Sequence, residues 1–255
     1  MYLSITAIVQ ARTSSSRLPG KVLLPILGRP MLLHQLDRIS RSDVIEQLVV
    51  ATSLDPSDDI LASTIESAGY SLCRGNLNDV LSRFLECSTL YNSSTIVRLT
   101  GDCPLIDSAS IDEVIRAFLS SDCDYLSNTF DETKLTIPDG FDVEVFGSDL
   151  LLEASQYALL PSEREHVTPW MRRSDIPFKS EHFMHRNASP FYRLTVDDQR
   201  DFDLVSYIFN SLYPTNPYFD LNIILDFLAR HPDIASSNIN TIRNEGYARS
   251  LLNDP

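Results

Sequence analysis

Residues 8–25 read IVQARTSSSRLPGKVLLP, and the interpretation of the whole chain starts from this stretch. An apolar run stops at Gln10, and a loop follows in which Arg12, Arg17 and Lys21 stand among small hydroxyl residues. A proline–glycine pair then turns the chain into a second apolar run. A buried strand followed by a flexible cationic loop is a common way to bind phosphate at the carboxyl edge of a sheet. The stretch therefore favours a site for a nucleoside triphosphate, although a solvated basic surface loop has the same local composition.

The composition is that of an acidic globular protein. The chain has 255 residues, of which 43% are apolar and 22% charged, so one domain spanning residues 1–255 is expected. Its 35 acidic and 21 basic residues give a net charge of −14, which argues against nucleic acid or an anionic membrane as a general partner. We identify no signal peptide, no apolar stretch near the roughly 20 residues that span a bilayer, and no CxxC pair. A cytoplasmic location is therefore expected.

Short buried runs alternate with amphipathic runs over the first half of the chain. The pattern predicts strands at 4–9, 47–52, 71–73, 95–99 and 124–127, and helices at 31–39, about 58–68, 78–90 and 108–119. This alternation favours an α/β fold with a mostly parallel sheet flanked by helices.

The alternation breaks after residue 127. Residues 141–146, FDVEVF, alternate apolar and acidic side chains, which predicts a hairpin or β-arm inserted at about 130–147. The remaining predicted elements are helices at 150–157, 163–174, about 200–211 and 221–230, and a strand at 192–196. They give a helical C-terminal part at about 199–255, for which the pattern predicts no element after Ile234.

Two aspartates directly follow predicted strands. Asp102 ends the run Thr100-Gly101-Asp102, and Asp197 follows the predicted strand at 192–196. Carboxylates at the ends of parallel neighbouring strands can share one metal ion near a bound phosphate. Each aspartate also has an ordinary interpretation, because aspartate is common in turns and at the start of helices.

Five motifs resemble those of one enzyme family. The loop Q-A-R-x-x-S-x-R-L-P-G-K at 10–21 resembles the signature of the cytidylyltransferases that activate 3-deoxy-manno-octulosonate and acylneuraminates. The other four are similar to the spore-coat polysaccharide SpsF-like branch: R-G-N-L-N-D-V-L-S-R-F (74–84), R-L-T-G-D-C-P-L-I-D (98–107), P-D-G-F-D-V-E-V-F (138–146) and E-R-E-H-V-T-P (163–169). The motifs occur in order between residue 8 and about residue 202, and they are specific jointly rather than singly.

The resemblance implies a Rossmann-like α/β nucleotidyltransferase with CTP as donor and Mg²⁺ as cofactor. It assigns to the nucleotide the residues Gln10, Ala11, Arg12, Ser16, Arg17, Lys21, Arg74, Asp79, Thr100 and Gly101. Arg17, Lys21 and Asp102 would be catalytic, and Asp102 and Asp197 would hold the metal. The second metal motif of the family is usually V-D-x-P-x-D-L, whereas residues 196–202 read VDDQRDF, so Asp198 stays an alternative to Asp197.

The implied reaction is transfer of a cytidylyl group from CTP to a sugar acid or related acceptor, with release of pyrophosphate, for surface polysaccharide biosynthesis. The resemblance also implies a homodimer in which the arm reaches the partner. The candidates for the acceptor site are Asp142, Glu144, Arg164, His166 and Arg193.

Two other interpretations concern metal chemistry elsewhere in the chain. The triplet Asp122-Cys123-Asp124 matches the DxD motif of metal-dependent glycosyltransferases, which share the broad fold and use a preformed nucleotide sugar. His182 and His185 are spaced for one helical face and are the candidates for zinc, although nearby Pro177 favours a strand or loop there.

Overall fold

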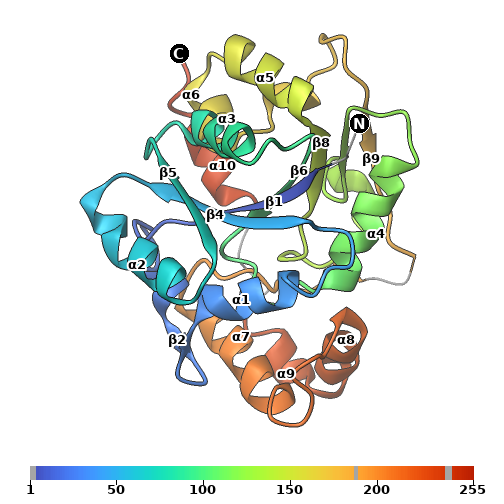
Figure 1. Cartoon of the computed structure of the whole chain (residues 1–255). Coiled ribbons are helices and arrows are strands. Elements are labelled where there is room, and N and C mark those ends of the chain that lie inside the picture. Colours follow the sequence, from blue (N-terminus) through green and yellow to red (C-terminus); the bar gives the residue numbers. More distant parts are fainter. Residues whose placement is uncertain (1–3, 187–188, 239–242) are drawn as a thin grey trace.

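The computed structural model describes residues 4–186, 189–238 and 243–255. Its centre is a seven-stranded sheet in the order β5-β4-β1-β6-β8-β7-β9, with helices on both faces (Figure 1). The strands of this sheet are β1 (Ile5–Gln10), β4 (Gln47–Ser53), β5 (Ser71–Gly75), β6 (Thr95–Thr100), β7 (Tyr125–Ser127), β8 (Glu144–Gly147) and β9 (Ser180–His182). A separate small hairpin pairs β2 (Pro25–Ile26) with β3 (Arg29–Pro30).

The first four strands of the sheet are parallel, as the βα alternation predicts. β1 pairs with β4 and β6, and Gln10 is level with Ala51 on one side and Thr100 on the other. The carboxyl ends of these strands therefore meet at one edge. β8 enters antiparallel between β6 and β7, with Glu144 opposite Arg98. Residues 144–147 of the stretch expected to form an arm are thus a strand of the main sheet.

The helices follow the predicted positions closely up to α5. They are α1 (Met31–Ile39), α2 (Asp59–Ser67), α3 (Val80–Leu90), α4 (Ser108–Leu119), α5 (Ser148–Tyr157), α6 (Pro161–His166), α7 (Gln199–Leu212), α8 (Leu221–Arg230), α9 (Pro232–Ala235) and α10 (Glu245–Leu251). Short 3-10 turns lie at Lys21–Leu23, Pro56–Asp58, Glu132–Lys134 and Trp170–Arg172. Aspartates at 79, 107, 198 and 220 accept hydrogen bonds from the first-turn amides of α3, α4, α7 and α8, which is why these helices begin where they do.

The sheet has a hydrophobic core on each face because strand side chains alternate. Ala7 and Val9 pack on one side with α1, α2, α4, α7 and α8, whereas Ile8 packs on the other with α3 and α5. Figure 1 shows α3, α5, α6 and α10 on one side of the sheet and α1, α2, α7, α8 and α9 on the other. The functional groups at the carboxyl edge are thereby held between two packed layers.

Two predicted elements are wrong. Residues 192–196 are not a strand of the sheet, because their only pairing is an isolated parallel bridge between Asp139 and Arg193. The helix expected at 163–174 ends at His166, because Val167 has a φ of 71° and cannot continue it. Among the described residues, no helix is both long and apolar enough to cross a membrane.

Gly140 explains how the segment 192–197 reaches the edge of the sheet. Its φ is +100°, and a Cβ at this position would lie 2.5 Å from the carbonyl carbon of Leu194 and from the amide nitrogen of Thr195. The neighbouring Asp139 O accepts from the Leu194 amide at 2.7 Å. Only glycine allows the two backbones to approach so closely, and the contact positions Asp197.

Candidate functional site

The basic loop, residues 10–21, begins where β1 ends. Asp58 fixes its backbone, because Asp58 Oδ1 accepts from the Thr13 amide and from the Thr13 hydroxyl, each at 2.7 Å. The loop closes on itself where Thr13 O accepts from the Gly20 amide at 2.8 Å. The three cations of the loop consequently line one open cavity of about 570 Å³.

Gly101 brings the basic loop close to the residues that follow β6. Its amide donates to Gln10 O at 2.8 Å. A Cβ at position 101 would lie 2.9 Å from Ala11 Cβ and 3.0 Å from Gln10 O. A larger residue would separate the loops, so this glycine fixes how near the basic loop lies to Asp102.

Lys21 is the centre of the site. Its Nζ donates to Asp102 Oδ2 at 3.0 Å, to Asp197 Oδ1 at 3.0 Å and to Val196 O at 2.7 Å. Burial disfavours the charged forms of both Lys21 and Asp102. The two carboxylates nevertheless raise the pKa of Lys21, and Lys21 lowers the pKa of Asp102 to about 2. Lys21 and Asp102 are therefore both charged at neutral pH, and two carboxylates are directed at one cation.

Asp197 is held in place from its other side by Arg193. Arg193 is only 8% exposed, and its Nη2 donates to Asp197 Oδ2 at 2.6 Å. It also contacts Asp139 at 2.6 Å and the fully buried Asp201 at 3.1 Å. Asp198, by contrast, caps α7 by accepting from the Asp201 amide at 3.1 Å. Of the two adjacent aspartates, the structure brings Asp197 to Lys21 and Asp102.

This arrangement fits a divalent cation that is bound together with phosphate. Mg²⁺ in phosphoryl-transfer sites is usually held by one or two carboxylates, with substrate phosphates and water as the remaining ligands. Asp102 and Asp197 supply such a pair, and both direct an oxygen at the position of the Lys21 ammonium. No group of three or more potential ligands from His, Cys, Asp and Glu occurs within the described ranges, so a metal cage made of protein alone is not seen there.

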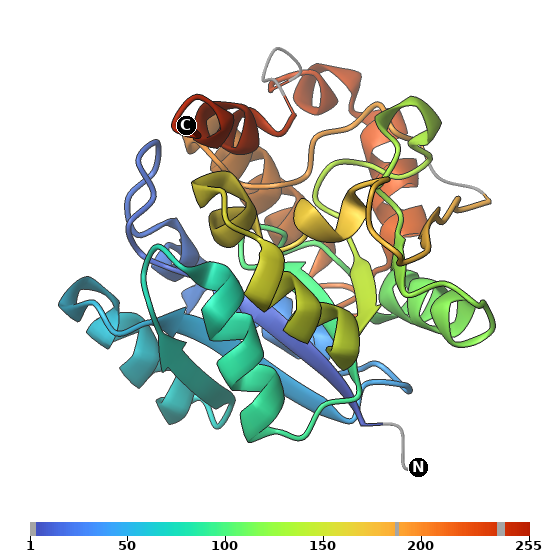
Figure 2. The same cartoon turned by 90° about the horizontal axis from the view of Figure 1, so that it is seen from above.

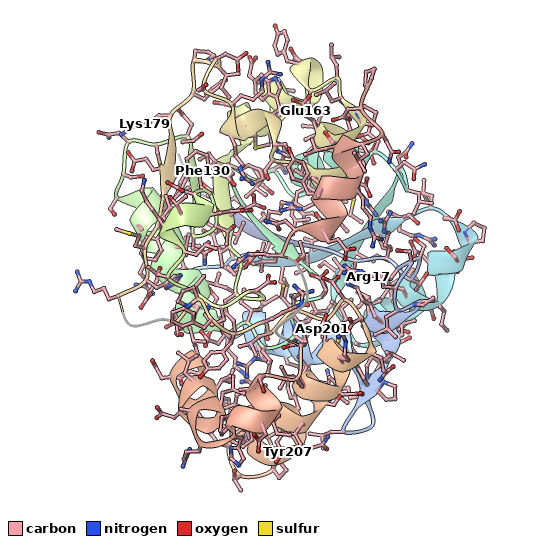
Figure 3. The ribbon with its side chains drawn as sticks, turned by 180° about the vertical axis from the view of Figure 1, so that it is seen from behind. Arg17, Phe130, Glu163, Lys179, Asp201 and Tyr207 are labelled. Atoms are coloured by element: carbon pink, nitrogen blue, oxygen red, sulfur yellow. The ribbon has the colours of Figure 1, made fainter. Side chains whose placement is uncertain are left out.

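The C-terminal helix α10 forms a wall of the same cavity. Arg17 forms an ion pair with Asp197 at 3.0 Å and donates to Glu245 Oε2 at 2.7 Å. Ser250 donates to Glu165 at 2.8 Å, which ties α10 to α6 beside it (Figure 2). In Figure 3, Arg17 lies beside α10, with Asp201 at the start of α7 below. The acidic end of α10 therefore neutralises a cation of the basic loop.

Most of the residues predicted from the sequence line this one cavity. From the nucleotide and metal sets they are Gln10, Ala11, Arg12, Ser16, Arg17, Lys21, Thr100, Gly101, Asp102 and Asp197, and from the acceptor set Glu144, His166 and Arg193. Burial and, next, the nearby Arg98 lower the pKa of His166 to about 4, so its ring is neutral at pH 7.

Four predicted residues lie elsewhere. Arg74 pairs with Asp59 of α2 at 2.7 Å. Asp79 caps α3 and pairs with Arg164 at 2.7 Å, and both line a second cavity of about 440 Å³ next to the first. Asp142 pairs with Arg243 at 2.8 Å. Their roles in binding remain predictions, and the contacts shown here are structural.

Several residues that line the cavity were not predicted from the sequence. They are Arg83, Arg98, Thr168, Arg172 and the residues of α10. Arg98 forms an ion pair with Glu144, which also accepts from the Thr168 hydroxyl at 2.6 Å. Arg83, Arg98 and Thr168 all lie inside the family motifs given above, so the sequence carried a signal for them, whereas it carried none for α10.

The two alternative metal motifs lie away from the cavity. Asp124 precedes β7, and its backbone oxygen accepts from the amide of Gly147, the last residue of β8. It therefore lies at the amino edge of the parallel strands, opposite the cavity. His185 is bonded to Glu113 at 2.9 Å and to Asn128 at 3.2 Å. A glycosyltransferase-type metal motif and a zinc pair thus gain no support from these positions.

A cationic loop and paired carboxylates at the carboxyl edge of a mostly parallel sheet are typical of an α/β nucleotide-binding protein of the transferase type. The family model described as Cytidylyltransferase matches residues 6–230. The chain is 34% identical over 250 residues to an uncharacterized protein of Methanocaldococcus jannaschii, covering 96% of this chain and 98% of that protein. It is 32% identical over 239 residues to the spore coat polysaccharide biosynthesis protein SpsF of Bacillus subtilis, covering 91% and 97%.

The solved structures agree with these relatives. A cytidylyltransferase from Leptospira borgpetersenii superposes with a TM-score of 0.86 at 31% identity, covering 94% of this chain and 99% of that one. The chain belongs to the cytidylyltransferase family and is a CTP-dependent nucleotidyltransferase. Because the family model ends at residue 230, α10 lies outside the part of the chain that it describes.

Proposed function

We propose that the protein transfers a cytidylyl group from CTP to a sugar acid or related hydroxyl acceptor and releases pyrophosphate. The observation that supports this most is the convergence of Asp102 and Asp197 on Lys21, with Arg17 beside them. Phosphoryl transfer needs little covalent chemistry from the protein, so positioning and charge neutralisation dominate. This cluster offers both at one end of the cavity.

Each charged residue has a defined task in this proposal. Arg17 and Lys21 hold the β- and γ-phosphates and offset the charge that builds up on the leaving pyrophosphate. Asp102 and Asp197 would hold a divalent metal, which would supply positive charge next to the phosphates and favour ionisation of the attacking hydroxyl. Arg193 keeps the Asp197 carboxylate oriented. No covalent enzyme intermediate is required.

The acceptor would occupy the part of the cavity lined by Glu144, His166 and Thr168. Glu144 is 6% exposed and bonded to Tyr125 and Thr168, so it is a rigid hydrogen-bond acceptor for hydroxyl groups. Arg172 lines the same cavity, and the one hydrogen bond of its side chain among the described residues is to Phe130 O at 3.4 Å. It is the cation we assign to the carboxylate of an acid acceptor. The name of the SpsF relative supports a surface polysaccharide as the destination.

A pyrophosphate-release screen tests the reaction. Purified protein is incubated with each of the four nucleoside triphosphates, Mg²⁺, and a panel of 2-keto sugar acids and phosphorylated polyols. We expect release that requires CTP and one acceptor class, and loss of at least about 100-fold in Asp102→Asn. The matched control is Asp198→Asn, which changes the neighbouring helix cap and should keep the activity. Equal release with UTP, or full activity in Asp102→Asn, would refute the proposal.

Mg²⁺ and a homodimer complete the proposal. Replacing Mg²⁺ by Ca²⁺ should abolish release, because Ca²⁺ favours more ligands and longer bonds than this carboxylate pair and a triphosphate supply. Sedimentation at micromolar protein concentration measures the assembly, and a monomer at all concentrations would contradict the dimer.

A further inference from the structure

The side chain of Arg83 is buried, and it has no hydrogen-bond partner among the described residues. It is 2% exposed and lines the cavity from α3. Its Nε and Nη1 are closed to solvent and have no hydrogen-bond acceptor among the residues that the structure describes. Burial and then the nearby Arg12 lower the pKa of Arg83.

The other buried arginines of the chain are satisfied. Arg38 is also 2% exposed, but its Nε donates to Ile106 O at 3.0 Å and its Nη2 to Leu105 O at 2.9 Å. Arg193, at 8% exposure, contacts three carboxylates. Burying an unpaired guanidinium is strongly unfavourable. Because the fold satisfies its two other buried arginines, Arg83 is left for a group from outside.

The position of Arg83 indicates which group this is. Val80 and Arg83 are three residues apart on α3, so they share a face, and both line the cavity. This part of the wall therefore combines an apolar side chain with hydrogen-bond donors, which suits a planar heterocycle better than a phosphate. The phosphates have Arg17 and Lys21, which lie with the carboxylate pair.

We propose that Arg83 determines the choice of base, by donating from its guanidinium to the O2 and N3 atoms of cytosine while Val80 packs against the ring. The inference rests on the proposed function, because it names how the CTP of that reaction is recognised. Cytosine presents two adjacent acceptors, which match the parallel donors of a guanidinium. Uracil carries a hydrogen on N3, so one donor of Arg83 would face another donor and stay unpaired.

Binding of the base in this way requires rotation about the last torsions of Arg83, which turns Nε and Nη1 toward the cavity. Bound CTP then removes the cost of the unpaired cation. When a site is built to hydrogen-bond one edge of a substrate, an analogue without the matching hydrogen-bonding groups is discriminated against by large factors.

The test compares binding with stability in the same variants. Arg83→Met removes the donors and the charge, and Arg38→Met is the matched control, a buried arginine with partners outside the cavity. Thermal unfolding is measured without nucleotide, and CTP and UTP affinities are measured by calorimetry in Mg²⁺. We expect Arg83→Met to unfold at the same or a higher temperature and to bind CTP about 30-fold more weakly, with CTP and UTP within about threefold of each other. Arg38→Met should unfold earlier and keep the preference for CTP.

Several outcomes would overturn the inference. If Arg83→Met is destabilised like Arg38→Met and binds CTP normally, Arg83 is a structural residue. If the affinities for CTP and UTP fall by the same factor, Arg83 binds phosphate and not the base. Should Arg83→Met fail to fold, Arg83→Lys keeps the charge but not the parallel donors, and an unchanged preference for CTP in that variant contradicts the inference. Absence of CTP binding by the unaltered protein refutes the proposed function itself, and this inference with it.

Discussion

Replacing Lys21 by methionine tests the carboxylate pair directly. The Lys21 side chain is 10% exposed and pairs with Asp102 and Asp197. Asp197 keeps Arg17 and Arg193 in the variant. Asp102 loses the one cation within 4.0 Å of it among the described residues. In the variant Asp102 is therefore a half-buried carboxylate next to a second carboxylate, without the cation that balanced its own charge.

The cost can be worked out from these contacts. Removing one partner of a buried ion pair costs about 3–5 kcal/mol, and we take the lower end because Asp102 keeps 26% of its side chain exposed. For a chain of this size a loss of about 3 kcal/mol lowers the melting temperature by about 6–12 °C. Mg²⁺ should restore much of the loss, because a cation at 100 times its dissociation constant stabilises by about 2.7 kcal/mol.

The assay is thermal unfolding with EDTA and with Mg²⁺. We expect Mg²⁺ to stabilise Lys21→Met more than the unaltered protein, in which the ammonium occupies the same place. Lys179→Met is the control, because Lys179 pairs only with Glu181 among the described residues and lies at the periphery (Figure 3). Two results would show that Asp102 and Asp197 do not form a cation site. One is that Mg²⁺ raises the melting temperature of Lys21→Met and of the unaltered protein equally, and the other is that Lys21→Met loses no stability in EDTA.

Acid titration provides an independent check of the same cluster. The pKa of Asp102 is lowered from 3.8 to about 2, mainly by Lys21 against the effect of burial. A lowered carboxyl pKa contributes stability that is present above the unfolded value and is lost as the pH falls through the folded value. The difference in stability between the unaltered protein and Lys21→Met should therefore shrink as the pH falls from about 4 to about 2.

Three further predictions concern other parts of the site. Glu245→Gln should tighten CTP binding about fivefold by calorimetry, because the triphosphate no longer competes with a carboxylate for Arg17, a partly exposed pair worth about 1 kcal/mol; weaker binding would mean that α10 assists the nucleotide. Gly140→Ala should lower the free energy of unfolding in urea by at least about 3 kcal/mol, because the added Cβ would lie 2.5 Å from backbone atoms. Gly147→Ala, where a Cβ has nothing within 4 Å, should change it by less than about 0.5 kcal/mol. Similar values for both variants would contradict the close approach at Gly140. The protein should lose stability between pH 7 and 4, because the pKa of His166 is about 4 in the folded protein and higher in the unfolded chain, which therefore takes up the proton first. His166→Gln should reduce this loss of stability by up to about 2 kcal/mol. Parallel pH profiles of stability for the variant and the unaltered protein would refute this.

The parallel half of the fold could be predicted from the sequence because it depends on local patterns. Buried apolar runs and capping aspartates define β1, β4, β5 and β6 and the helices between them. The antiparallel entry of β8 could not be predicted in this way, because its register depends on the distant pairing of Glu144 with Arg98. The apolar alternation at 192–196 indicated a strand, but the segment is held by Gly140 and one bridge rather than by a ladder.

Some residues of the candidate site could likewise be predicted from the sequence and others could not. Arg17, Lys21 and Asp102 are visible in the sequence because cations in an acidic chain and a carboxylate after a strand are unusual locally. Arg83 carried a signal that sequence reasoning missed, since it occupies an inward position beside Phe84 on the amphipathic α3. The short polar helix α10 has no apolar periodicity, so only the three-dimensional structure could bring Glu245 to Arg17.

The way α10 is attached has a consequence for solution conditions. Ser250 is its one buried residue, and neither hydrophobic core includes a described residue beyond Ala235. The helix is held by the ion pair of Glu245 with Arg17, by hydrogen bonds of Ser250 with Glu165 and His166, and by the edge contact of Tyr247 with the His166 ring. Interactions of this kind between partly exposed charges weaken with salt, whereas burial of apolar surface does not. Ionic strength is thus the variable that should open this wall of the cavity while the sheet beneath it stays folded.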